Sequence, residues 1–391
     1  MHSPRLCTAW HAVAIATALA APIPASAQTD TYARISVSAT QIYDGNLFAT
    51  PASRAPQADL ISRIGPAFEA GYLSPPFAID ARYEIQAERY LDHPDLDANA
   101  AHQDATLAVR YRPMPRFTLR ADAAYIATQT PAQFNVGSQL NIGSQLGVGR
   151  TPAERVTMAA TGTYEWSKVT TATLEYAFGR DALIGSAPSV LHRSRLGVRR
   201  KAGLRNIYRA DYEIREVQFG HLAWLPSQVI TAGWAHAITQ RTGFEIAIGP
   251  RLTDGTIRPE VSAQLRRALS RGEVSLGYWR TELTAIGERG AIDVHRVAAG
   301  ITYRPARRIN LTATPAYSRS ARGRQQVPVY TLDLESMMTA TRSLSLVGWA
   351  RIGRQEGTLS GLRDTIPYRT LGVKLMIAFP AGPPAGGLPP S

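Results

Sequence analysis

The chain has 391 residues, with 43 lysines and arginines against 30 aspartates and glutamates, and one cysteine. That cysteine, Cys7, lies within an N-terminal export signal, which excludes a disulfide framework and thiolate chemistry in the mature chain. No later stretch approaches the roughly 18 apolar residues of a membrane-spanning helix, so a helical membrane protein is excluded as well.

The N-terminal segment has the organisation of a secretory signal peptide. His2 and Arg5 precede a mostly apolar stretch over 9–23, and the small residues Ala25-Ser26-Ala27 follow it. This order of charged, apolar and small residues predicts a cleaved signal over 1–27, with a mature chain that begins near Gln28.

The segment FAIDARYEIQAERYL, residues 77–91, sorts its side chains by parity. Apolar residues from Phe77 to Ala87 take the odd positions, and polar or charged residues from Asp80 to Glu88 take the even ones. In a strand these two sets lie on opposite faces. A soluble fold of this size would contain strands that are apolar on both faces, or helices that cover a sheet. Because nearly every run here keeps one polar face, we expect lipid outside and water inside.

Similar runs recur along the chain and predict an all-β, antiparallel transmembrane barrel of 16 to 18 strands, with about 18 as the best count. Sixteen is the nearest alternative, because the regions 129–165 and 217–252 are indistinct. The predicted runs are 32–43, 60–73, 77–91, 104–112, 117–128, 155–165, 169–179, 189–201, 204–216, 228–238, 243–252, 257–268, 272–285, 291–304, 308–320, 328–340, 343–354 and 366–379.

The connectors alternate in length along the chain. Tight turns such as 74–76, 113–115 and 305–307 alternate with longer polar connectors, and short periplasmic turns with longer outer loops are typical of outer-membrane barrels. The connector 129–152 contains the repeat NVGSQL-NIGSQL, which fits either an extended outer loop or a loop folded into the lumen. The predicted barrel spans 28–379, and the Pro/Gly-rich tail 380–391 is expected to be disordered.

The first quarter of the mature chain carries a family resemblance. The segment YDGNLFATP places Tyr43, Asp44, Asn46 and Pro51 in a signature loop, and Asp59, Arg63 and Pro66 continue the pattern in the next run. These residues resemble the start of the beta-barrel porin 2 family and of outer-membrane proteins associated with exosortase (PEP-CTERM) systems. The resemblance implies a Gram-negative outer-membrane barrel that inserts through the barrel-assembly machinery. It also implies that Phe379 acts as the terminal-strand assembly signal.

Arginines gather on the polar face of two successive runs. By parity they share one sector of the lumen wall, where a basic surface would favour anions. The predicted basic cluster is Arg193, Arg195, Arg199, Arg205, Arg209 and Arg215. A network of mutually paired charges along a wet wall is the equally simple alternative.

A barrel this wide leaves an aqueous lumen, so the sequence predicts a porin-like channel for small hydrophilic, possibly anionic, solutes. The alternatives are a conduit for acidic exopolysaccharide export and a plugged structural or adhesive barrel. No motif of a hydrolase, metal site or phosphate-binding loop occurs, so we expect neither an enzyme nor a cofactor, and no nucleic-acid partner. The expected surroundings are outer-membrane lipid and lipopolysaccharide.

Overall fold

The computed structural model describes residues 30–130, 150–283, 292–322, 325–358 and 364–381. The predicted signal peptide, most of the connector 129–152 and nearly all of the tail lie outside these residues. Within them no helix is long and apolar enough to cross a membrane.

The described chain forms one 18-stranded antiparallel sheet in which each strand pairs with its neighbours in sequence. The strands are β1 (Asp30–Asp44), β2 (Asp59–Leu73), β3 (Phe77–Tyr90), β4 (Ala98–Met114), β5 (Phe117–Thr128), β6 (Ala153–Glu165), β7 (Thr170–Leu183), β8 (Ser189–Ala202), β9 (Asn206–Phe219), β10 (Leu225–Ala237), β11 (Thr242–Thr253), β12 (Thr256–Leu269), β13 (Gly272–Leu283), β14 (Ile292–Ala306), β15 (Ile309–Arg322), β16 (Gln325–Thr339), β17 (Leu344–Glu356) and β18 (Thr365–Ala381). Two three-residue 3-10 helices, η2 (Ala52–Arg54) and η3 (Pro94–Leu96), lie in connectors.

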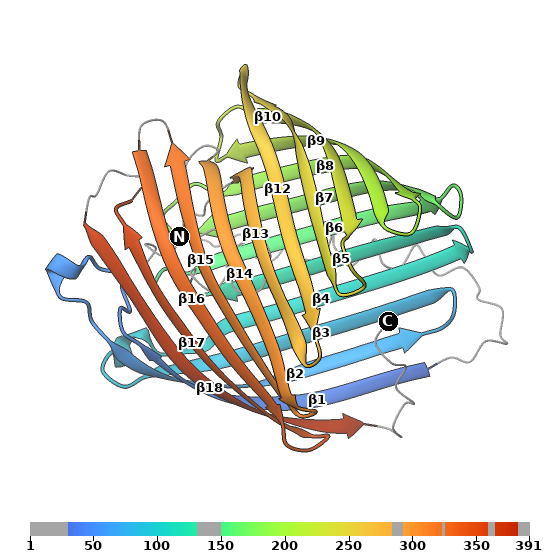
Figure 1. Ribbon diagram of the computed structural model, residues 1–391. Coiled ribbons are helices and arrows are strands. Elements are labelled where there is room, and N and C mark those ends of the chain that lie inside the picture. The colour runs from blue at the N-terminus through green and yellow to red at the C-terminus, as the bar shows by residue number, and fades with distance from the viewer. Residues whose placement is uncertain (1–29, 131–149, 284–291, 323–324, 359–363, 382–391) are drawn as a thin grey trace.

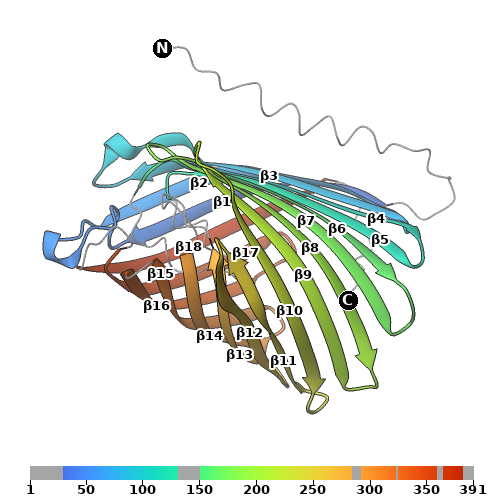
Figure 2. The same ribbon diagram turned by 90° about the horizontal axis from the view of Figure 1, so that it is seen from above.

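The sheet closes on itself because β1 pairs with both β2 and β18. Figures 1 and 2 show the inclined strands wrapping around a common interior. Closure gives every strand a hydrogen-bonded neighbour on both sides, as hydrocarbon requires. The predicted all-β barrel is therefore confirmed, with 18 strands and not 16.

The two ends of the barrel differ in the connectors they carry. One end of the barrel, called here the short-turn end, carries the tight turns. The start of β1 and the end of β18 also lie there, since Ala33 of β1 pairs with Ala381 of β18. The other end, here the long-loop end, holds the longer connectors, including 45–58 and 91–97. The connector between β11 and β12 departs from the predicted pattern. At the long-loop end β11 and β12 are joined by Asp254 and Gly255 alone, and their positive φ angles of 46° and 69° fit a tight hairpin.

Several predicted boundaries are wrong. β4 begins at Ala98, although the sequence pattern assigns residues 98–103 (ANAAHQ) to a connector. These residues show no alternation of apolar and polar side chains. The backbone ladder nevertheless continues through them, since His102 pairs with Gln86 of β3 and with Thr128 of β5. At this height on the strand the outward side chains need not be apolar. β18 also runs two residues beyond Phe379.

Candidate functional site

Parity along each strand separates the outer face from the lumen. On β8 the exposed Leu196 and Val198 point outward, whereas Arg193, Arg195 and Arg199 take the alternate positions. Exposed leucine, isoleucine, valine and tyrosine side chains recur on the same outer face around the barrel. The candidate site is therefore the inner, polar face of the sheet.

Most of the predicted basic cluster is paired with acids. Arg193 contacts Glu175 of β7, and Arg195 lies 2.9 Å from Asp211 of β9. These contacts join neighbouring strands, as the registers Glu175–Arg195 and Gly197–Asp211 allow. At these positions the arginines of the inner wall are ion-paired with acids and do not form an uncompensated basic surface.

The remaining members of the cluster have different surroundings. Arg209 contacts Glu245 of β11, and Arg215 contacts Glu213 and lies 2.9 Å from Glu260 of β12. Arg199 is exposed and has no ion pair within the described part of the chain. Arg205 was predicted to belong to the same wall, but it lies in the turn 203–205, because β9 begins only at Asn206.

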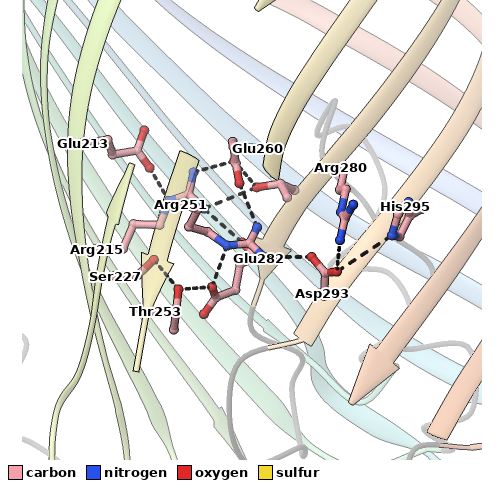
Figure 3. A network of polar contacts seen from close by, with 11 residues as sticks. Glu213, Arg215, Ser227, Arg251, Thr253, Glu260, Arg280, Glu282, Asp293 and His295 are labelled. Atoms are coloured by element: carbon pink, nitrogen blue, oxygen red, sulfur yellow. Dashed lines mark hydrogen bonds and ion pairs between the residues drawn. The ribbon is translucent and has the colours of Figure 1, made fainter. Parts of the chain in front are cut away.

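A buried charge cluster, drawn in Figure 3, centres on Arg251 of β11, whose side chain has no exposed surface. Its guanidinium lies 2.8 Å from Glu260, 3.0 Å from Glu282 and 2.8 Å from Asp293. Asp293 also lies 3.3 Å from Arg280. These are charge-assisted contacts of the strong class.

This Arg251 cluster spans a seam in the sheet. The ladder between β12 and β13 ends at the pair Val261–Arg280, although β12 extends back to Thr256 and β13 extends on to Leu283. Beyond that pair, Arg251 joins Glu260 on one side of the seam to Glu282 and Asp293 on the other. Side chains thus hold the two hairpins together where backbone hydrogen bonds stop.

The signature loop builds a folded structure at the long-loop end. The buried Asn46 donates from its side-chain amide to the carbonyls of Thr50, at 2.9 Å, and Pro367, at 2.8 Å. Its own backbone N–H donates to Asp44 at 3.0 Å. Tyr43, by contrast, is exposed on the outer face, and Pro51 immediately precedes η2. The buried members of the signature therefore tie the connector 45–58 to the start of β18.

A second buried cluster lies on the lumen side of β2 and β3. Glu88 of β3 is fully buried and lies 2.6 Å from both Arg63 of β2 and Arg150, which precedes β6. The Arg150 guanidinium also lies 4.2 Å from the centre of the Tyr90 ring, within cation–π range. One end of the connector 129–152 is thereby attached to the inner wall of β3, while the repeat itself lies outside the described residues.

The lumen contains a cavity of about 940 Å³. Its lining includes Arg63, Arg266, Arg296 and Arg351 together with Asp44, Asp104, Glu273, Asp333 and Glu335. None of the six arginines predicted from β8 and β9 is part of this lining. Parity could place the charged lining residues on the inner face, but the sequence could not tell which strands border the cavity.

Apolar side chains occupy part of the lumen toward the long-loop end. One group comprises Ile292 and Val294 of β14, Val327 and Val329 of β16, and Tyr368 of β18. A second group includes Leu47 of the signature loop, packed against Ile42, Ile61 and Tyr90. These groups narrow the lumen. Tyr90 shares the parity of Glu88 and faces inward.

Histidines offer no metal site within the described residues, where no group of three potential ligands meets. His221 lies in the connector before β10, and His236 lies at the other end of that strand.

Comparisons with known proteins agree with the architecture. The structure of OpdQ from Pseudomonas aeruginosa aligns with a TM-score of 0.50 and 11% identity, covering 90% of this chain and 98% of that one. OpdL from the same organism and OccAB4 from Acinetobacter baumannii each give a TM-score of 0.49, with 10% and 9% identity, and each covers 90% of this chain and 99% of its own.

At 11% identity the likeness to OpdQ concerns the fold alone, a closed antiparallel β-barrel. No protein-family model and no curated protein matches the sequence, so the resemblance of the signature loop to the beta-barrel porin 2 family stays a prediction.

Proposed function

We propose that this protein is a porin-like channel of the Gram-negative outer membrane that passes small hydrophilic solutes. The observation that carries the proposal is the charged lumen cavity of about 940 Å³ inside a closed barrel whose outer face is apolar. Charged residues of both signs line the cavity. They offer hydrogen-bond donors and acceptors to a solute that loses part of its hydration shell on entry.

Single-channel recording in planar bilayers tests this function. An open channel should give discrete conductance steps, and neutral sugars of increasing size should permeate liposomes up to a cut-off. Purified, fully assembled protein that conducts no ions would instead support the plugged structural barrel. Passage of long acidic oligosaccharides would favour the exopolysaccharide conduit.

A modest preference for anions is the finer part of the proposal. Four arginines of the β8–β9 sector are matched by acids, whereas Arg199 of the same sector is an exposed, lumen-facing cation with no ion pair to a described residue. Solvated charges act over about 8 Å at physiological ionic strength, so the preference should fade in high salt.

The Arg199→Glu change should move the reversal potential toward cations. Arg200→Glu supplies the matched control, because Arg200 is the next residue on β8 and points to the opposite face. Equal shifts in both variants would mean that overall charge, and not the lumen wall, sets the selectivity.

A further inference from the structure

The described connectors at the two ends of the barrel differ in charge. The eight tight turns of the short-turn end contain eight cations and no acid: Arg116, Lys168, Arg205, Arg241, Arg271, Arg307, Arg308 and Arg342. The described connectors of the long-loop end contain two arginines and five aspartates: Arg54 and Arg150, with Asp92, Asp95, Asp97, Asp254 and Asp364. The short-turn end therefore presents a basic collar, defined here as its eight turn cations.

The collar is not neutralised from within the protein. All eight side chains belong to exposed residues, and none forms an ion pair with another described residue. Arg271 and Arg308 reach only backbone carbonyls, those of Pro305 at 3.4 Å and Ala340 at 2.9 Å. The contrast with the fully buried and multiply paired Arg251 shows that these charges are available to an external anion.

Apolar side chains share the same turns. Leu204, at the tip of the β8–β9 turn, is 105% exposed, and Trp166, in the β6–β7 turn, is 70% exposed. Lys168 and Arg205 lie within two residues of these tips. Exposed apolar tips flanked by cations are the arrangement that fits the boundary between lipid headgroups and acyl chains.

We propose that the short-turn end binds anionic phospholipid headgroups in the leaflet that surrounds it. Arginine suits phosphate, because its planar fork matches two phosphate oxygens at once. The turns that carry the collar adjoin the strands whose apolar outer side chains face lipid. The headgroups of neighbouring lipids therefore lie at the level of the collar. A hydrated acidic glycan of the cell wall could neutralise the cations, but it would leave Leu204 and Trp166 in water.

Binding of this kind should enrich anionic lipid around the barrel, by about fivefold for each arginine that engages a headgroup. In bacterial barrels the short turns face the periplasm, so the leaflet concerned is the inner one. Lipid binding by the collar requires a bilayer around the barrel but does not require the barrel to conduct ions. A channel that proves closed would overturn the proposed function and leave this inference standing.

The test measures lipid association in nanodiscs made from mixtures of phosphatidylcholine and phosphatidylglycerol. Lipids retained by the purified protein are counted by native mass spectrometry, at low and at high salt. The variant Arg271→Gln/Arg307→Gln/Arg308→Gln removes three collar charges on adjacent turns. The control Arg54→Gln/Arg89→Gln/Arg354→Gln removes three charges near the long-loop end and so matches the change in net charge. Heat-modifiable mobility checks that each variant is assembled.

We expect the wild type to retain phosphatidylglycerol over phosphatidylcholine, the collar variant to lose most of that preference, and the control to keep it. High salt should weaken the preference, and soluble glycerol phosphate should compete poorly, because it lacks the apolar part. Absence of a phosphatidylglycerol preference in the wild type would overturn the proposal, as would equal loss in both variants. Collar-dependent cosedimentation with peptidoglycan sacculi, without any lipid preference, would overturn it in favour of a cell-wall partner.

Discussion

Replacing Arg251 by methionine should destabilise the barrel more than any exposed charge change. The substitution keeps an unbranched side chain at the site but removes the cation from three carboxylates within 3.0 Å. Glu260 would keep Arg215 and Asp293 would keep Arg280, whereas Glu282 would retain only the hydroxyl of Thr253, at 2.6 Å.

Breaking a buried ion pair by removing one partner costs about 3–5 kcal/mol. Because two of the three carboxylates keep another cation, we expect a loss near the lower end, about 3 kcal/mol. Adding Glu282→Gln to Arg251→Met should restore part of this loss, since it removes the carboxylate left without a cation. Arg34→Met is the matched control. Its pair with Glu69, at 3.5 Å, is about half exposed and should be worth about 0–1 kcal/mol.

The assay is urea unfolding of protein folded into phospholipid vesicles, with the folded fraction read from heat-modifiable mobility and tryptophan fluorescence. The comparison of interest is the free energy of unfolding of each variant relative to the wild type. If Arg251→Met and Arg34→Met lost the same amount, the reasoning that the Arg251 cluster closes the seam between β12 and β13 would be refuted.

Three further outcomes follow from the wall, the signature loop and a surface carboxylate. Leu196→Arg, near the middle of β8 on the outer face, should cost about 2–4 kcal/mol in vesicle unfolding, whereas Thr161→Arg, opposite Glu175 on the inner face, should assemble normally; similar behaviour would contradict the assignment of faces. Asn46→Ala should make the connector 45–58 sensitive to limited proteolysis, because it removes the hydrogen bonds to the Thr50 and Pro367 carbonyls. The connector should be cleaved more slowly in Ser53→Ala than in Asn46→Ala. The hydroxyl of Ser53 holds the pKa of the partly exposed Asp364 below its ordinary value. This contact should therefore be present at neutral pH and be lost as the pH falls through that lowered pKa; an NMR titration in which Ser53→Ala does not raise the pKa of Asp364 would speak against it.

The sequence by itself determined the fold class and the two faces of the wall. Strand parity is a local property, because alternate side chains point to opposite sides whatever the strand pairs with. For this reason a run such as 77–91 was sufficient to place Ile79 outside and Glu88 inside, and the repetition of such runs gave the number of strands.

Which side chains meet, and which strands border the cavity, depended on the three-dimensional arrangement of the strands. Arg251 and Asp293 are 42 positions apart, and Asn46 and Pro367 are 321 apart. Their contacts depend on the stagger of 18 strands, on the point where the β12–β13 ladder ends, and on a loop that folds back against β18. Parity gives the face of a residue but neither its height nor its position around the barrel. Parity therefore placed the predicted arginine sector on the inner wall but did not identify its acidic partners. The buried Arg251 cluster could not be predicted, because it depends on the register that brings β9, β11, β12, β13 and β14 together.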